Sequence, residues 1–213
     1  MKKTILFLAL LCVGGFSFAQ SDRYASAMKS NISLLDSIMI KHNAAELVNN
    51  FIRIAEAEKT QWLPYYYAAY TKVIEALTET DNSKKDAITD KAKELINKAE
   101  SILGKENSEI DVIKSMIATS YMTVDPQSRY MSYSSEINDN IEKAKKSDPT
   151  NPRPYLFQAQ NIFYTPEQFG GGKETAKPLF DKAKELFASF KPESELSPNW
   201  GKSTLDYFLA QYK

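Results

Sequence analysis

The stretch DAITDKAKELINKAESILG, residues 86–104, decides the fold of this chain. Its apolar residues recur at spacings of three and four, so one helix face carries Ile88, Ala92, Leu95, Ile96, Ala99, Ile102 and Leu103. Lysines and glutamates fill the other face. Gly104 stands where a residue with positive φ commonly ends a helix. The stretch therefore predicts an amphipathic helix that packs one face against neighbouring helices.

The whole chain follows this helical pattern. Glycine is scarce beyond residue 20, and no Asn-Gly or Asp-Gly hairpin signal occurs. In KKSDPTNP, residues 145–152, Pro149 stops one helix and Asn151 can cap the next. We predict an all-α fold of about nine helices, near residues 24–41, 44–59, 61–79, 84–103, 109–123, 134–147, 152–164, 174–190 and 198–212.

The first nineteen residues have the pattern of a secretory signal peptide. Lys2 and Lys3 precede an apolar run over residues 5–13 that is too short to span a bilayer, and the small-x-small motif of residues 17–19 precedes Gln20. We predict cleavage after Ala19 and a periplasmic or secreted protein. Residues 20–213 then form a single domain.

The charge of that domain argues against two classes of partner. Without Lys2 and Lys3 it carries 25 basic side chains (27 minus 2) and 27 acidic ones, and both signs are interleaved. Such a chain has neither a basic surface for nucleic acid nor a polybasic segment for membranes. We expect no nucleic-acid partner and no membrane insertion after cleavage.

Three predicted helices share one pattern of small, bulky and small side chains. It occurs as Ala92, Ile96 and Ala99, again as Ile137, Ile141 and Ala144, and again as Ala176, Phe180 and Ala183. The pattern resembles the second helix of a tetratricopeptide repeat, in which an alanine allows close helix contact. The units begin 45 and 39 residues apart (92 to 137 to 176), more than the roughly 34 residues of the family. The resemblance covers residues 62–190. The longer spacing implies a divergent array of repeats with long connections.

This resemblance implies a right-handed solenoid of antiparallel helix pairs. The helices before Trp62 would be atypical end units, and the last predicted helix would cap the array with Leu205, Phe208 and Leu209. Trp200 is interpreted as a structural plug of that cap. Ala-x3-bulky-x2-Ala also arises in unrelated amphipathic helices, so a helical bundle of another kind stays open as the alternative.

In the tetratricopeptide family the first helices line a concave groove that holds an extended peptide. By that register the groove candidates are Tyr67, Tyr70, Leu156, Gln160, Phe163 and Tyr164. Tyrosine suits such a surface because it offers an apolar ring and a hydroxyl group. Plain packing of Tyr67 and Tyr70 in the core is the alternative.

Two long connections are predicted, over residues 125–130 and 164–172. Long loops often carry function, although packing explains both of these as well. Arg129 in the first loop is a candidate to clamp a carboxylate of a partner, or else to bind Asp125 of its own loop. Phe169 in the second loop is expected to tuck its ring beneath the loop.

Catalysis has few candidate residues. The chain has one histidine, His42, and one cysteine, Cys12, in the segment predicted to be removed. Zinc sites of several histidines and cysteine nucleophiles are therefore excluded, and we predict no enzyme, no metal and no cofactor. We predict a monomeric scaffold that binds a protein or peptide segment. The alternatives are a small-ligand binder, for sugars or peptidoglycan fragments, and a carboxylate-dependent hydrolase.

Overall fold

The computed structural model describes residues 22–35 and 44–212, and within them the fold is all-α, as predicted. Residues 22–32 are helical. The further helices are α3 (Ala44–Glu58), α4 (Leu63–Thr78), α5 (Asn82–Leu103), α6 (Ser108–Val124), α7 (Pro126–Ser147), α8 (Arg153–Tyr164), the 3-10 helix η2 (Glu167–Phe169), α9 (Lys173–Ser189) and α10 (Lys202–Ala210).

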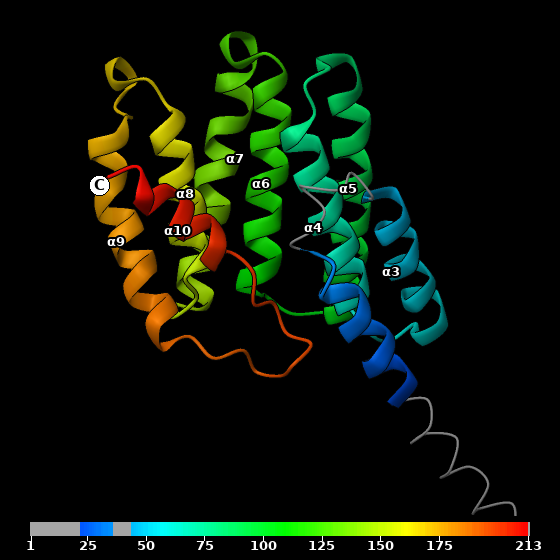
Figure 1. The fold of residues 1–213 in the computed structure, drawn as a ribbon. Helices are drawn as coiled ribbons and strands as arrows, with labels where there is room; N and C mark the ends of the chain where they lie inside the picture. Colours follow the sequence, from blue (N-terminus) through cyan, green and yellow to red (C-terminus); the bar gives the residue numbers. More distant parts are fainter. Residues whose placement is uncertain (1–21, 36–43, 213) are drawn as a thin grey trace, which may run out of the picture.

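Helices α4 to α9 stand side by side as three antiparallel pairs (Figure 1). Each pair joins a first helix (α4, α6 or α8) to a second (α5, α7 or α9). The small-bulky-small pattern faces the packing surface as expected, because Ala92, Ile96 and Ala99 are fully buried. Its counterparts in α7 and α9 are buried as well. These alanines allow close helix approach.

The helix ends follow local capping rules. The Asp81 carboxylate accepts the backbone N–H of Ser83 at 3.0 Å, and the Asn107 side chain accepts two backbone N–H groups at the start of α6. Gly104 ends α5 in the left-handed conformation, at φ +66°, as its position in the sequence predicted. Asn151 accepts the backbone N–H of Arg153 at the start of α8.

One predicted loop is wrong. Residues 125–130 do not form a long connection, because α7 begins at Pro126 and Asp125 is its N-cap, accepting the backbone N–H of Ser128 at 3.3 Å. Proline fits the first position of a helix, where its missing N–H costs nothing. Helix α7 is therefore eight residues longer at its start than the predicted span of 134–147.

The buried side chains form two core clusters. The larger joins α3 to α7 with part of α8, and the smaller joins α8, α9 and α10 around Phe180 and Phe208. The predicted capping role of the last helix is confirmed, since Leu205 and Phe208 are buried in the smaller cluster.

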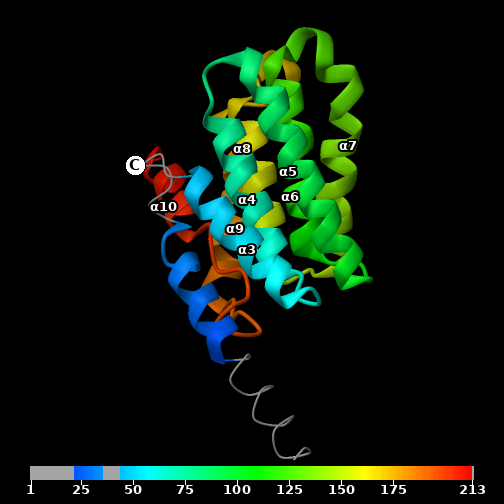
Figure 2. The same cartoon turned by 90° about the vertical axis from the view of Figure 1, so that its right-hand side faces the viewer.

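A segment without regular structure, residues 191–201, joins α9 to α10, and we call it the strap. It crosses the ends of α8, α6 and α4 before the chain returns as α10 (Figure 1). In Figure 2 the strap and α10 lie on one side of the helix stack, and α5 and α7 lie on the other. Leu196 and Trp200 of the strap pack on the larger cluster, so the C-terminal segment links both cores.

Candidate functional site

Two exposed aromatic side chains lie next to the smaller cluster, where α8 ends beside α10. Tyr164 is 70% exposed and Tyr207 is 61% exposed. Their rings meet the Phe208 ring edge to face, with centroids 5.9 Å and 5.4 Å away. We call this group, with Phe163 and Tyr212, the aromatic surface.

The aromatic surface rests on a rigid base. Phe208 stacks on the buried Phe180, with ring centroids 4.9 Å apart and an interplanar angle of 18°. Phe163 meets both rings edge to face. Aromatic pairs at these distances add stability beyond the area they bury. The exposed tyrosines therefore project from a packed core.

Two cations border this surface. Lys173 Nζ lies 4.8 Å from the centroid of the Tyr212 ring, and Lys177 Nζ lies 5.9 Å from it. The Tyr212 hydroxyl donates to the backbone carbonyl of Lys173 at 2.6 Å, which fixes the ring beside the start of α9. Desolvation, followed by the nearby Tyr207 phenol, raises the pKa of Tyr164. At neutral pH the Tyr164 phenol is therefore uncharged.

The predicted groove face is partly filled by the chain itself. Tyr67 and Leu156 are 1% exposed, so their assignment to an open groove surface is wrong for this structure. The Tyr67 hydroxyl donates to the backbone carbonyl of Leu196 in the strap at 2.8 Å. Leu156 lies beneath Gly201, at the end of the strap. The extended segment that lies against α4 and α8 is therefore the strap of this chain and not a peptide of a partner.

Tyr70 also contacts the strap. Its ring stacks on the indole of Trp200, with centroids 4.5 Å apart and an interplanar angle of 24°. The Trp200 indole N–H donates to the Tyr66 hydroxyl at 2.8 Å. Trp200 therefore packs against the protein itself, but on α4 of the first helix pair and not in the cap of the last pair, where it was predicted.

A buried polar network lies beside these tyrosines. Arg153 is fully buried, and its Nη1 lies 2.9 Å from a carboxylate oxygen of Glu109. Tyr66 and Asn151 both donate to the same carboxylate. Arg153 Nη2 donates to the backbone carbonyl of Pro198 in the strap. Among the described residues, Arg153 Nε and the Tyr24 hydroxyl are the buried polar side-chain atoms without a hydrogen-bond partner.

The remaining candidates are Gln160 and Arg129, and Phe169 is the remaining loop residue. Gln160 is half-buried on α8, in the same helix as Phe163 and Tyr164. The Arg129 guanidinium pairs with Asp86 and not with Asp125: it donates two hydrogen bonds, of 2.7 and 2.8 Å, to the Asp86 carboxylate. This pair ties the start of α7 to α5. Phe169 is 73% exposed, so its predicted place beneath the loop is wrong.

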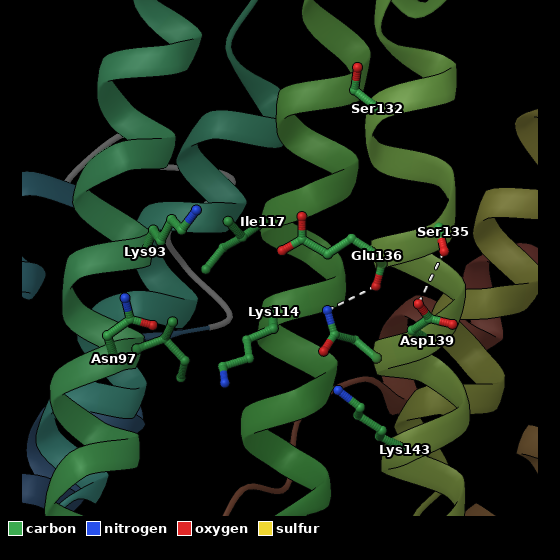
Figure 3. Close-up of a pocket in the computed structure, with 11 residues that line it drawn as sticks. Lys93, Asn97, Lys114, Ile117, Ser132, Ser135, Glu136, Asp139 and Lys143 are labelled. Atoms are coloured by element: carbon green, nitrogen blue, oxygen red, sulfur yellow. Dashed lines mark hydrogen bonds between the residues drawn. The ribbon is translucent and has the colours of Figure 1, made fainter.

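A polar cleft of about 540 Å³ lies between α5 and α7, over α6 (Figure 3). Its buried floor is formed by Ile96 and Ile117. One lysine from each of the three helices lines it, with two carboxylates from α7; these residues are Lys93, Lys114, Lys143, Glu136 and Asp139. The mixed charges largely compensate one another, so the cleft selects no class of ligand by charge.

Within residues 22–35 and 44–212, no three His, Cys, Asp or Glu side chains gather in a way that could hold a metal ion. His42 lies outside the described residues. In the part of the chain that is described, no helix combines the length and the apolar character needed to cross a bilayer.

Sequence reasoning found Phe163 and Tyr164 but missed Tyr207 and Tyr212. The helical pattern of residues 198–212 gave Phe208 a buried position and left Tyr207, its neighbour, on an exposed side. That an exposed tyrosine of α10 would lie beside Tyr164 depends on the packing of segments 43 residues apart (207 minus 164). No local pattern encodes that proximity.

The described residues form an all-α protein of stacked helix pairs with an aromatic surface where α8 ends beside α10. No protein-family model matches the chain, and a search of the curated proteins finds no match. Among solved structures, the HusA haemophore from Porphyromonas gingivalis is similar, with 35% sequence identity and a TM-score of 0.78. The match covers 89% of this chain and 92% of that one. The chain therefore belongs to the family of the HusA haemophore.

Proposed function

We propose that this chain is an exported, non-catalytic binding protein for a planar tetrapyrrole such as haem. The observation that carries the proposal is the membership of the haemophore family, since a haemophore binds haem. The predicted signal peptide agrees with a role outside the cytoplasm. The tetratricopeptide resemblance, and a protein segment as the ligand, stay predictions.

The aromatic surface suits the flat face of a tetrapyrrole. Tyr164 and Tyr207 present exposed rings on a base of buried rings, so little ordering is needed before a ligand stacks there. Lys173 and Lys177 lie beside Tyr212, where the Lys173 ammonium group can pair with a propionate of the ligand, and Lys177 can do so in exchange for its exposed pair with Asp181. Recognition would use the macrocycle face and the carboxylates.

A haemin titration followed by absorbance tests this proposal. We expect the native mature chain to bind haemin, and the Tyr164→Ala, Tyr207→Ala double variant to bind it at least about tenfold more weakly, because two stacking contacts are lost. Metal-free protoporphyrin should bind to the same surface, since stacking does not require iron.

Tyr130→Ala provides the matched control. Tyr130 is an exposed tyrosine, but it lies on α7 away from the aromatic surface. Its removal should leave haemin affinity unchanged. A native chain that does not bind haemin, or a double variant that binds as the native chain does, contradicts the assignment to the aromatic surface.

A further inference from the structure

The strap presents two acceptor oxygens and one flat ring to the helices beneath it. The Leu196 carbonyl accepts from the Tyr67 hydroxyl, and the Pro198 carbonyl accepts from the Arg153 guanidinium. Between α4 and α8, the Trp200 indole stacks on the Tyr70 ring. The helices therefore hold a phenol donor, a guanidinium donor and an aromatic face directed at one segment.

A flat aromatic molecule that carries carboxylates presents the same groups. Its carboxylate oxygens can replace the two carbonyl oxygens, and its ring can replace the indole of Trp200. A carboxylate is a stronger acceptor for Arg153 than the Pro198 carbonyl, because donor and acceptor are then both charged, and this gain is reduced by Glu109, which already pairs with Arg153. It can also engage Arg153 Nε, which is buried without a hydrogen-bond partner.

The strap has no regular secondary structure, and a short run of residues makes its contacts to α4 and α8. Five of its eleven residues are exposed; Leu196 and Trp200 pack on the larger cluster, and Pro198 is buried. The ion pair of Glu195 with Lys29 is exposed on both sides, so it adds little.

The far end of the strap is fixed. Gly201 has φ +106°, and a Cβ there would lie 3.0 Å from a methyl carbon of Leu156 and 3.1 Å from the Phe187 ring. Gly201 is buried against these groups, and the buried Leu205 and Phe208 hold α10 on the smaller core cluster, so we expect displacement to be confined to residues 191–200. The aromatic surface is then unchanged when the strap moves.

We propose that the strap covers a second site, for a flat aromatic carboxylate, and competes with that ligand for Tyr67, Tyr70 and Arg153. The inference rests on the proposed function, since a tetrapyrrole with two propionates is such a ligand. Because the site is open in only a fraction of molecules, the apparent affinity is reduced by that fraction. A substitution that weakens the strap should therefore raise the affinity of the covered site for the ligand. If the strap contacts only stabilised the fold, the same substitution would lower that affinity or leave it unchanged.

The test isolates the covered site in the Tyr164→Ala, Tyr207→Ala background. Haemin is titrated into this variant with and without Trp200→Ala, which removes the competing ring. We expect Trp200→Ala to increase haemin affinity about tenfold or more. Leu196→Ala is a second, milder strap variant in case the first disturbs folding, and circular dichroism checks the helix content of each.

Two further measurements complete the design. Tyr70→Leu in the same background should abolish the gain, because the stacking face belongs to the helices and not to the strap. In the native chain, haemin should increase hydrogen exchange at residues 191–200. Without ligand, those amides should exchange more slowly.

The outcomes separate the two proposals. Strap variants that bind haemin as weakly as their background, or more weakly, overturn the covered site while the aromatic surface stands. Binding that appears with Trp200→Ala in the double-variant background, when the native chain shows none, supports the covered site and overturns the aromatic surface as the native site. If no variant binds haemin, both proposals fail.

Discussion

Arg153 and Glu109 form a buried ion pair between the first turns of α8 and α6, with Nη1 of Arg153 2.9 Å from Oε1 of Glu109. Arg153 is fully buried, and the Glu109 side chain is 12% exposed. Desolvation of both charges is costly, and the donors Tyr66 and Asn151 offset it by binding the Glu109 carboxylate. The pair joins α8 to the larger core cluster, and Arg153 also binds the strap.

Removal of one partner of this pair should be strongly destabilising. Arg153→Ala leaves the Glu109 carboxylate buried without its cation, which we expect to lower the free energy of unfolding by about 3–5 kcal/mol. Urea denaturation followed by circular dichroism measures the loss. Lys177→Ala, which breaks the exposed pair with Asp181, is the control and should change little. Equal stability of the two variants would contradict this assignment.

Asp111 should give the protein a pH-dependent stability. Burial, only partly compensated by Lys114 and Lys143, raises the pKa of Asp111 to about 6. In the unfolded chain an aspartate titrates near 3.9, so the folded state binds the extra proton between about pH 4 and 6. The stability contributed by this proton is present below about pH 4 and is lost as pH rises through 6.

Asp111→Asn should remove that part of the pH dependence. The full shift corresponds to about 3 kcal/mol, and solvent screening of this partly exposed group reduces it to about 1 kcal/mol. Urea denaturation of the native chain and the variant from pH 4 to pH 7.5 gives the difference. A difference that stays constant over this range would show that Asp111 does not titrate there, and Asp181→Asn serves as the exposed control.

Gly171 should tolerate no side chain. A Cβ there would lie 2.2 Å from the backbone carbonyl oxygen of Thr165, so the loop must move. We expect Gly171→Ala to cost about 2–3 kcal/mol of stability. Gly104→Ala is the matched comparison, since nothing lies within 4 Å of its Cβ and only the positive φ is strained, at about 1 kcal/mol. Thermal unfolding ranks the two, and the reverse order would contradict the loop geometry.

Substitution of Phe208 should lower stability, whereas substitution of Tyr207 should lower haemin affinity. Phe208→Ala removes a buried ring that stacks on Phe180, and we expect a loss of about 3–5 kcal/mol of stability. Tyr207→Ala removes an exposed ring, so stability should change by less than about 1 kcal/mol while haemin affinity falls. Denaturation and haemin titration of both variants provide the readouts. A Tyr207→Ala variant that loses stability like Phe208→Ala would show that Tyr207 is part of the support.

Local sequence determined the helices and most of their ends. The three- and four-residue spacing of apolar side chains depends only on helix geometry, so residues 86–103 could be read directly, as could the stop at Gly104. The start of α7 lies outside the predicted span because Asp125 and Pro126 fit a loop as well as a helix start, although proline is common at the first helical position.

Tertiary structure alone decided where the functional candidates lie. The burial of Tyr67 and Leu156 depends on the strap, which folds back over helices far away in the sequence. The Arg153–Glu109 pair and the contact of the Tyr164 ring with the Phe208 ring likewise join segments more than 40 residues apart. Helical periodicity specifies which face of each helix is apolar. It does not specify which distant segment covers that face, because that depends on the packing of the whole chain.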